Sequence, residues 1–312
     1  MPASLLRLEI FSSLAGLRHC PARSSYDSIV ASRDAGTPVR VADREFPRYS
    51  DVVQRPPAPA AIPEPARPDL PRHIGIIMDG NGRWARQRHL PRAAGHRAGV
   101  RAIRQVMEAC DQAGVHILTL YAFSTENWSR PRAEVAALMR LFSETIDREI
   151  DELDAEGIQL RILGRREELG DRLRAKIEAA EARTAHNASN ILNVAINYGG
   201  RREIVDAVRD LATRGADLGS LEASDLSGAL YTAGLPDPDL IIRTAGELRI
   251  SNFLLWQAAY AELYVTETLW PDFGREDLQG ALRAFAERER RFGAIEPPEP
   301  PDEVAPRASH GG

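Results

Sequence analysis

An acid, two glycines and an arginine follow an apolar run in the first half of the chain. The stretch HIGIIMDGNGRW, residues 73–84, places Asp79, Gly80, Gly82 and Arg83 directly after isoleucine-rich sequence that is typical of a buried strand. Glycines let backbone N–H groups approach an anion because no Cβ intervenes, and a planar guanidinium matches phosphate oxygens. A carboxylate repels that anion but can hold the Mg²⁺ that accompanies diphosphates. A glycine-rich turn capped by an aspartate is an equally good interpretation of this short motif.

Arg92 and His96 follow the glycine turn at a short distance along the chain. Either side chain can bind a second phosphate group if the chain folds back toward the turn. A lone arginine or histidine near a helix start is more often structural, but here two of them follow a candidate anion-binding loop.

A second polar cluster follows the next apolar run, in YAFSTENWSRP, residues 121–131. Ser, Thr, Glu and Asn are also common in turns and helix caps, so a plain turn is the alternative interpretation. A tryptophan inside such a cluster is unusual for a plain turn. The candidate residues of this segment are Ser124, Thr125, Glu126, Asn127, Trp128 and Arg130.

A third segment, IIRTAGELRISNF at residues 241–253, contains two guanidinium groups and a hydroxyl. Arg243, Arg249 and Ser251 predict a second anion-binding site. Glu262 begins a later apolar run and is a candidate second carboxylate for the metal. Acids at strand starts usually face solvent, so Glu262 alone is a weak indication.

The three segments together predict two anionic substrates and a divalent cation. The sequence motifs of nucleotide binding and of nucleophilic catalysis are absent. Lys176 is the only lysine, so the chain contains no GK[ST] of a Walker A loop. No GxGxxG follows the first apolar run, and no nucleophile–base dyad has a recognisable spacing.

These segments must be positioned by the elements that precede them. Apolar runs at 74–78, 117–123, 158–164, 191–198, 239–244 and 262–266 predict strands. Amphipathic runs at 98–114, 131–157, 167–187, 201–214, 224–233 and 276–291 predict helices between them. This alternation predicts a single α/β domain with a mostly parallel six-stranded sheet flanked by helices. Ligands bind at the carboxyl edge of such sheets, where the polar segments lie.

The two ends of the chain differ from the centre. Residues 1–71 end in RPPAPAAIPEPARPDLP, which predicts a polyproline-like or disordered extension, and 294–312 predict a similar tail. The net charge of −5 argues against a nucleic-acid partner. Cys20 and Cys110 are isolated, and no apolar run is long enough to span a membrane, so we expect a cytoplasmic protein.

Five segments closely resemble the cis-prenyltransferases of the undecaprenyl diphosphate synthase family. They are HIGIIMDGNGRWA, YAFSTENWSRP, AINYGGRREI, RTAGELRISNFLLWQAAYAELYVTETLWPDF and AERERRFG, in the family's order. The resemblance covers residues 72–293 and implies the undecaprenyl diphosphate synthase-like fold. It implies that isopentenyl diphosphate is added repeatedly to an allylic diphosphate, usually farnesyl diphosphate, with Mg²⁺ as cofactor.

The resemblance also implies roles for the candidate residues. Asp79 is the implied metal ligand, and Asn127 the implied proton acceptor, although an amide is a poor base. The implied allylic diphosphate site consists of Gly80, Asn81, Gly82, Arg83, Arg92 and His96, with Trp84 in the same segment. The segment that orders over the substrates contains Ser124, Thr125, Glu126, Trp128 and Arg130. The implied isopentenyl diphosphate site contains Arg243, Arg249, Ile250 and Ser251, and Glu262 is the implied second metal ligand.

Further expectations follow from the resemblance. An Arg-x-Gly element at Arg291–Gly293 implies a homodimer, and the product implies delivery to the inner face of the plasma membrane. Leu248 stands where some members have a metal-linked histidine. We expect a product tunnel beside residues 131–156, lined by Ala122, Ala136, Ala137, Leu138, Leu141, Phe142 and Ile146. Small Ala122 favours a long product such as undecaprenyl diphosphate. A short-chain synthase and a non-catalytic partner subunit are the alternatives.

Overall fold

A parallel six-stranded sheet forms the centre of the protein in the computed structural model, which describes residues 55–288. The strands lie in the order β3-β4-β2-β1-β5-β6, and all neighbouring pairs are parallel. The predicted fold class is confirmed, and the predicted strand ends differ from the observed ones by at most one residue. The strands are β1 (His73–Ile77), β2 (Ile117–Ser124), β3 (Ile158–Leu163), β4 (Asn190–Tyr198), β5 (Leu240–Arg243) and β6 (Glu262–Val265).

The helices of the described region alternate with these strands, as the sequence predicts. Several of them differ from the prediction: the helix predicted at 98–114 begins at Arg92, and the one predicted at 224–233 ends at Ser227. The glycine turn opens directly into α1, which the sequence analysis did not expect, and the helix predicted at 167–187 starts only after Gly170, whose φ is 79°. The helices are α1 (Asn81–Gln87), α2 (Arg92–Ala113), α3 (Arg132–Ala155), α4 (Asp171–Thr184), α5 (Gly200–Thr213), α6 (Ala223–Ser227) and α7 (Arg275–Ala286).

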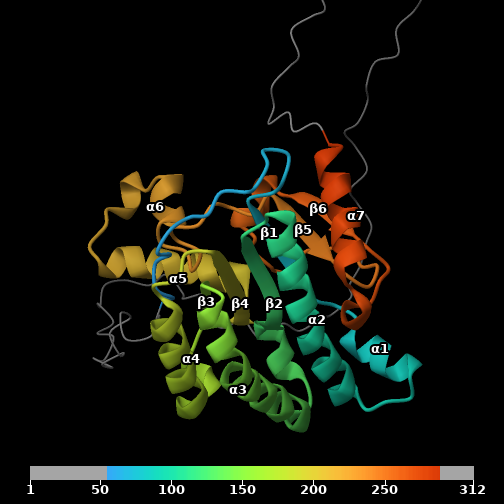
Figure 1. The fold of residues 1–312 in the computed structure, drawn as a ribbon. Coiled ribbons are helices and arrows are strands. Elements are labelled where there is room, and N and C mark those ends of the chain that lie inside the picture. The colour runs from blue at the N-terminus through green and yellow to red at the C-terminus, as the bar shows by residue number, and fades with distance from the viewer. Residues whose placement is uncertain (1–54, 289–312) are drawn as a thin grey trace, which may run out of the picture. The chain divides into compact units, whose positions relative to one another are not determined.

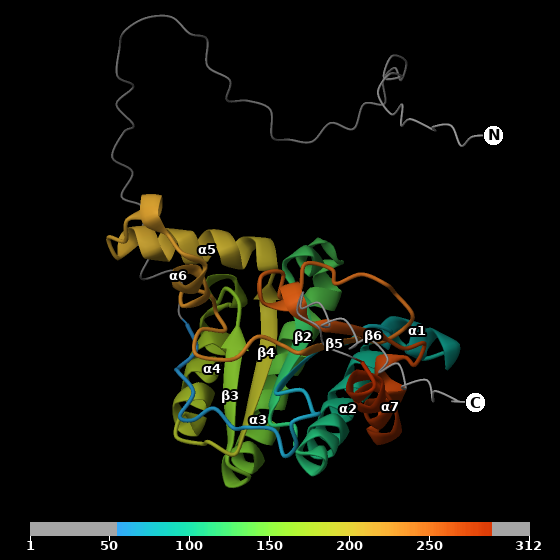
Figure 2. The ribbon, with the colours of Figure 1, turned by 90° about the horizontal axis from the view of Figure 1, so that it is seen from above.

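Both faces of the sheet are covered, so the strands are apolar along most of their length. Figures 1 and 2 show α2 and α3 on one side of the sheet, and α5 and α6 on the other. Ile74 and Ile76 belong to the larger core, which includes residues of α2, α3 and α7. Ile77 faces the opposite side, in a smaller core with Tyr121 and Tyr198. This burial of both faces fixes the register that aligns the strand ends.

Residues 55–71 contain no helix or strand, but they lie against the domain (Figure 2). The Ala58 carbonyl accepts a hydrogen bond of 3.0 Å from Gln159, and the Ala66 N–H donates one of 2.9 Å to Gly114. Proline removes backbone donors without preventing such isolated contacts through the remaining amides and carbonyls. Residues 55–71 therefore contact the domain whose start the sequence analysis places at residue 72, and that boundary stays a prediction.

The remaining expectations about the chain ends lie outside the described residues. These are the extension as far as residue 54, the tail 294–312 and the element Arg291–Gly293. Within residues 55–288, none of the helices has the length and apolar character that crossing a membrane requires.

Candidate active site

Asp79 and Arg243 meet at the carboxyl edge of the sheet, where β1 and β5 lie side by side. Ile77 pairs with Arg243 in the strand register, so Asp79 follows immediately beyond that pair. Arg243 Nη2 donates a hydrogen bond of 2.9 Å to Asp79 Oδ2. The Arg243 side chain is only 6% exposed, which strengthens this charged contact. Both residues line one cavity of about 530 Å³, so they can act on the same pair of ligands.

The backbone around Asp79 is fixed from two sides. Its N–H donates to the Thr244 hydroxyl at 2.9 Å, and that hydroxyl donates to the Asp79 carbonyl at 2.7 Å. Gly80 follows with φ 107°, and a Cβ there would lie 3.1 Å from the Ala245 Cβ. Only glycine fits this conformation without strain, so Gly80 sets the direction in which the chain enters α1.

Arg83, on α1, lies near Asp79 but outside the lining of the cavity. Its guanidinium is 3.8 Å from Asp79 Oδ2 and 3.8 Å from Glu247 Oε1. At these separations the contacts are electrostatic and leave the donors of Arg83 available to a phosphate group.

The loop after β5 supplies two hydrogen-bond acceptors to Nη1 of Arg243. Arg243 Nη1 donates to the Arg249 carbonyl and, at 2.7 Å, to the Ser251 hydroxyl. Ser251 has a φ of 48°, which indicates a conformation held by its surroundings. The Arg249 guanidinium instead pairs with Glu247 at 2.6 Å. Arg243 and Ser251 therefore form the inner part of the predicted second anion site, and Arg249 its exposed edge.

A carboxylate that the sequence analysis missed organises the other cationic residues. Glu134, in the first turn of α3, lies 3.3 Å from Arg92 and 3.2 Å from Arg130. His96 Nε2 is 3.9 Å from the same carboxylate oxygen. The i,i+4 spacing of Arg130 and Glu134 was the available sequence signal. Glu134 holds these three residues together beside the polar cavity, whose lining includes His96 and Arg130.

His96 is neutral at pH 7. Burial lowers its pKa to about 4, and the neighbouring guanidinium of Arg130 acts in the same direction. His96 Nε2 is buried and has no hydrogen-bond partner among the described residues. The histidine therefore offers a hydrogen bond to a ligand rather than a positive charge.

The segment after β2 is both a capped turn and part of the cavity wall. The Ser124 N–H donates to Asn127 Oδ1 at 3.2 Å, which caps the short 3₁₀ helix Thr125–Ser129. Trp128 Nε1 donates to Asn197 at 2.7 Å and so ties the turn to β4. The two interpretations offered by the sequence are thus compatible.

Nearly half of the predicted site residues line the polar cavity, and the others surround it or lie elsewhere. Trp84, for example, donates to Asp272 at 2.7 Å, and Ile250 packs against the smaller core. The predicted residues that line the cavity are Asp79, Asn81, His96, Ser124, Glu126, Asn127, Arg130, Arg243 and Ser251. Those outside its lining are Gly80, Gly82, Arg83, Trp84, Arg92, Thr125, Trp128, Arg249, Ile250 and Glu262.

Glu262 does not lie beside Asp79 in one chain. It is the first residue of β6 and pairs with Leu240, at the amino end of β5, whereas Asp79 follows the carboxyl edge. Three residues of parallel strand separate these two edges by about 10 Å. Glu262 forms an ion pair with Arg288 instead. Within one chain the strand direction thus places Asp79 and Glu262 at opposite edges of the sheet, and Glu262 as a second metal ligand stays a prediction.

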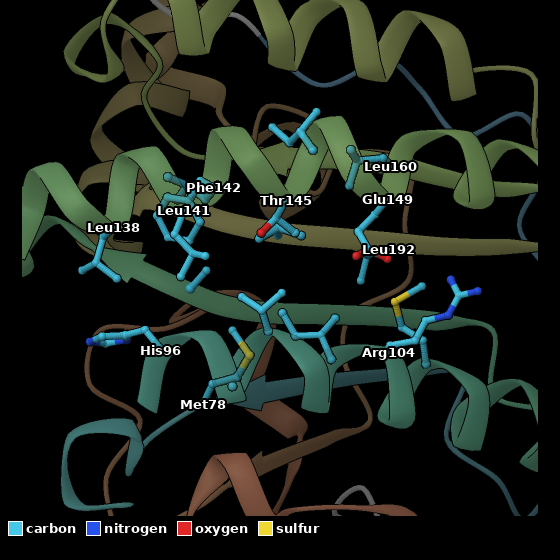
Figure 3. A pocket seen from close by; sticks show the side chains of 18 of the residues that line it. Met78, His96, Arg104, Leu138, Leu141, Phe142, Thr145, Glu149, Leu160 and Leu192 are labelled. Carbon is cyan, nitrogen blue, oxygen red and sulfur yellow. The ribbon is translucent and has the colours of Figure 1, made fainter. Parts of the chain in front are cut away.

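An apolar cavity continues from the polar one between α2, α3 and the sheet (Figure 3). The two cavities share five lining residues: Met78, Asn81, His96, Ala122 and Leu138. Of the predicted tunnel residues, Leu141, Phe142 and Ile146 also line the apolar cavity. Ala136 and Ala137 are exposed on the outer face of α3, so that part of the prediction is wrong.

This arrangement suits one kind of chemistry. Buried or partly buried cations can bind anionic groups, and Asp79 contacts two of them, Arg243 and Arg83. The apolar cavity offers space for a hydrocarbon attached to one of these groups. Within residues 55–288, no group of three or more His, Cys, Asp or Glu residues has the geometry to hold a metal. The polar cavity and the adjoining apolar cavity therefore lie side by side, with arginines and a carboxylate in or next to the first and apolar side chains lining most of the second.

The chain is similar to known proteins over most of the described domain. Residues 77–293 match the family described as "Putative undecaprenyl diphosphate synthase". A ditrans,polycis-undecaprenyl-diphosphate synthase ((2E,6E)-farnesyl-diphosphate specific) of Pseudomonas aeruginosa is 54% identical over 229 residues, which are 72% of this chain and 91% of that protein. An isoprenyl transferase of Heliobacterium mobile is 52% identical over 230 residues, 72% of this chain and 88% of that protein.

A solved structure supports the assignment. Lavandulyl diphosphate synthase from Lavandula x intermedia, in complex with dimethylallyl diphosphate, has a TM-score of 0.70 and 35% identity, covering 73% of this chain and all of that one. On the extent of the family match and the identity to these relatives, the chain belongs to the undecaprenyl diphosphate synthase family of prenyltransferases.

Proposed function

We propose that this chain is a cis-prenyltransferase that extends an allylic diphosphate with isopentenyl diphosphate. One observation carries the proposal: Asp79 and Arg243 line a polar cavity that opens into an apolar one. In each cycle the C–O bond of the allylic diphosphate breaks and diphosphate leaves with the electron pair. The double bond of isopentenyl diphosphate forms the new C–C bond, and a proton is lost from the adjacent carbon.

The residues of the site support this reaction by stabilising negative charge. The charge on the leaving diphosphate grows as the C–O bond breaks, so fixed cations near it lower the barrier. Arg83, Arg92, Arg130 and neutral His96 are the donors available on the α1, α2 and α3 side. Arg243 and Ser251 are the donors on the β5 side, where we place isopentenyl diphosphate.

The donor set fits Mg²⁺ that arrives with a diphosphate. Mg²⁺ is usually bound in proteins by one or two carboxylates together with substrate phosphates and water. Asp79 is the carboxylate at the centre of the cavity, and it would hold the ion, which when bound withdraws charge from the departing diphosphate. Leu248 cannot contribute, since it has no ligand atom and its side chain is 81% exposed.

The role of Asn127 in proton removal stays a prediction. Its Oδ1 already accepts the Ser124 N–H, so one lone pair is used by the turn. An amide oxygen is also a poor base. The geometry favours a positioning role for Asn127 over proton transfer.

One assay tests the proposed function. Incubation of the purified chain with farnesyl diphosphate, radiolabelled isopentenyl diphosphate and Mg²⁺ is expected to give a long polyprenyl diphosphate, by analogy with the product in the relatives' names. Chelation of Mg²⁺ should abolish incorporation. A product with one or two added units would support a short-chain synthase, and no incorporation would support a non-catalytic subunit. The intact Asp79–Arg83 segment argues against the latter.

We expect Ala122→Leu to shorten the product. Ala122 lines both cavities at their junction, where a hydrocarbon must pass from the polar site into the apolar space. A branched side chain there fills the passage, and a packed interior accommodates added methylenes poorly. Sizing of the extracted lipids measures the effect. An unchanged chain length would show that the hydrocarbon takes another path.

We further propose that the chain forms a homodimer through the β6 edge. β6 ends the sheet, so one side of its backbone has no neighbouring strand in the described part of the chain. Leu263 and Tyr260 are exposed beside this edge, and apolar edge strands in native proteins are normally covered. Light scattering after gel filtration should report a dimer for the wild type and a shift to monomer for Leu263→Lys. Leu218→Lys, at a comparably exposed leucine, should not shift it; a monomeric wild type would contradict the proposal.

A further inference from the structure

Asn252 joins three segments that are distant from one another in the sequence. Its Nδ2 donates a hydrogen bond of 2.9 Å to Glu126 Oε1, in the turn after β2. Its Oδ1 accepts the Arg201 N–H at 2.9 Å, and its carbonyl accepts the Gly200 N–H at 2.7 Å, both at the start of α5. Asn252 and Glu126 both line the polar cavity, although the sequence analysis singled out only Glu126.

The orientation of the Asn252 side chain is fixed by its own surroundings. Ser251 and Asn252 have left-handed backbone conformations, with φ values of 48° and 64°, which asparagine adopts more readily than most residues. The Arg201 N–H is a donor only, so the oxygen of the Asn252 amide must face it. The amide nitrogen is therefore left to face Glu126.

The turn after β2 and the loop after β5 meet over a glycine. A Cβ at Gly199 would lie 2.7 Å from Asn252 Nδ2 and 2.8 Å from Thr125 Oγ1. Gly199 has an extended backbone, with φ −163°, so the close approach of these two side chains is what requires glycine there. The two segments are thus held in direct contact.

Glu126 takes part in this contact in its charged form. Its partial burial acts to raise the pKa, but hydrogen bonds from its own backbone N–H, from Asn252 and from the side chains of Ser124 and Thr125 lower the pKa of Glu126 below its ordinary value. The amide of Asn252 is a neutral donor. It therefore holds a carboxylate at the cavity wall without adding a cation that would compete for a diphosphate.

The two joined segments carry groups that the proposed function assigns to different substrates. Arg130, at the end of the turn after β2, lies 3.2 Å from Glu134 on the allylic side. Ser251, next to Asn252, accepts a hydrogen bond of 2.7 Å from Arg243 on the isopentenyl side. Condensation requires the carbon atoms of two bound substrates to meet in one orientation. A link between the segments fixes that orientation rather than the affinity for either substrate.

We propose that Asn252 is a positioning residue for the condensation step, a proposal that rests on the proposed function. It holds Glu126, and with it the turn after β2, against the loop that carries Ser251. Each diphosphate can bind to its own segment alone. The reaction between the two needs both segments in their linked arrangement.

Asn252→Asp separates this role from a general structural one. The change keeps the size of the side chain, the acceptor for the Arg201 N–H and the tolerance of a left-handed backbone. It replaces the donor to Glu126 by a second carboxylate, so the pair binds a proton with a raised apparent pKa. That proton restores a donor between the two groups. Tyr121 also interacts with Glu126, but burial raises the pKa of Tyr121 above the range of the assay.

The assay measures kcat and both KM values with farnesyl diphosphate, radiolabelled isopentenyl diphosphate and Mg²⁺. At about pH 8, Asn252→Asp is expected to lower kcat about 10- to 100-fold, as the loss of a hydrogen bond to a charged group does. The ratio of its kcat to that of the wild type should rise as the pH falls toward about 5.5. Both KM values should stay within about threefold of the wild type, because an orienting contact acts on the bound substrates.

Two further variants complete the test. Gly199→Ala should also lower kcat, because its Cβ displaces Asn252, but the ratio to the wild type should not depend on pH. Asn190→Asp is the matched control: Asn190 Nδ2 donates to Asp111 at the same 2.9 Å, at the start of β4 and outside the lining of the polar cavity. It should have the wild-type kcat at every pH.

Thermal unfolding must show that each variant is folded, and Gly199→Ala carries the test if Asn252→Asp is not. A wild-type kcat in the folded variants would overturn the proposal. So would a loss in Asn252→Asp that is the same at every pH, or a rise in KM for one substrate alone, which would place Asn252 in direct contact with that substrate. A wild-type protein that makes no polyprenyl diphosphate would instead refute the proposed function, so the two failures are distinguishable.

Discussion

Asp79→Ala is expected to lower kcat by about 10²–10³, the usual cost of removing one preorganised electrostatic contact at a charged transition state. Asp79 is the carboxylate that faces both anion sites, and it also holds Arg243 through a hydrogen bond of 2.9 Å. Its removal therefore disturbs the metal site and the orientation of a buried guanidinium together. Steady-state assays with saturating farnesyl and isopentenyl diphosphates measure the effect.

Two further variants make this prediction specific. Asp79→Asn retains the size and a hydrogen-bond acceptor for Arg243 but loses the charge, so we expect most of the activity to be lost and the Mg²⁺ requirement to rise. Asp171→Ala, at a fully solvated carboxylate in the first turn of α4, should behave as the wild type. Thermal unfolding must show that Asp79→Ala is folded. Activity near the wild-type level in folded Asp79→Ala would remove Asp79 from the mechanism.

Arg243→Lys is expected to reduce kcat/KM for isopentenyl diphosphate by about 10²–10³, at constant farnesyl diphosphate. The Arg243 fork bonds Asp79, the Ser251 hydroxyl and the Arg249 carbonyl at once. A lysine places one compact charge on a flexible stem and cannot satisfy three acceptors in a plane. The unfolding free energy should also fall by about 1–3 kcal/mol, because buried partners are left without hydrogen bonds.

The kinetic pattern decides which diphosphate Arg243 binds. A rise in KM confined to isopentenyl diphosphate supports the placement on the β5 side. A rise confined to the allylic substrate would reverse the two sites. Arg214→Lys, at an exposed arginine whose ion pair lies on the surface of α5, is the matched control and should leave both constants unchanged.

Local sequence patterns predicted all six strands and the polar segments that follow them. Apolar runs with the lengths of strands predicted every strand, because both faces of a parallel sheet are buried and their sequence is continuous in hydrophobicity. The helix α1 was missed, because DGNG is a turn signal over so short a range. Contact with α2 and with the segment around Trp270 stabilises α1, and no local pattern records such contacts.

The metal ligand set shows the limit of the same reasoning. Asp79 and Glu262 are both acids at strand boundaries, and sequence treats the boundaries alike. Strand direction places Asp79 at the carboxyl edge of the sheet and Glu262 at its amino edge. The two carboxylates therefore lie apart within the folded chain. Glu134 was missed for the opposite reason. It is remote from Arg92 and His96 along the chain, and only the packing of α3 beside α2 brings it to them.

The sequence by itself determined a parallel α/β domain, anion-binding groups at its strand ends and the family to which the chain belongs. These depend on residue type and on the spacing of neighbours, which a linear pattern contains. The tertiary structure alone decided that Asp79 and Arg243 share a cavity and that Glu262 lies at the opposite edge of the sheet within the chain. Each of these depends on which distant segments pack together, and the burial of whole helix and sheet faces determines that packing.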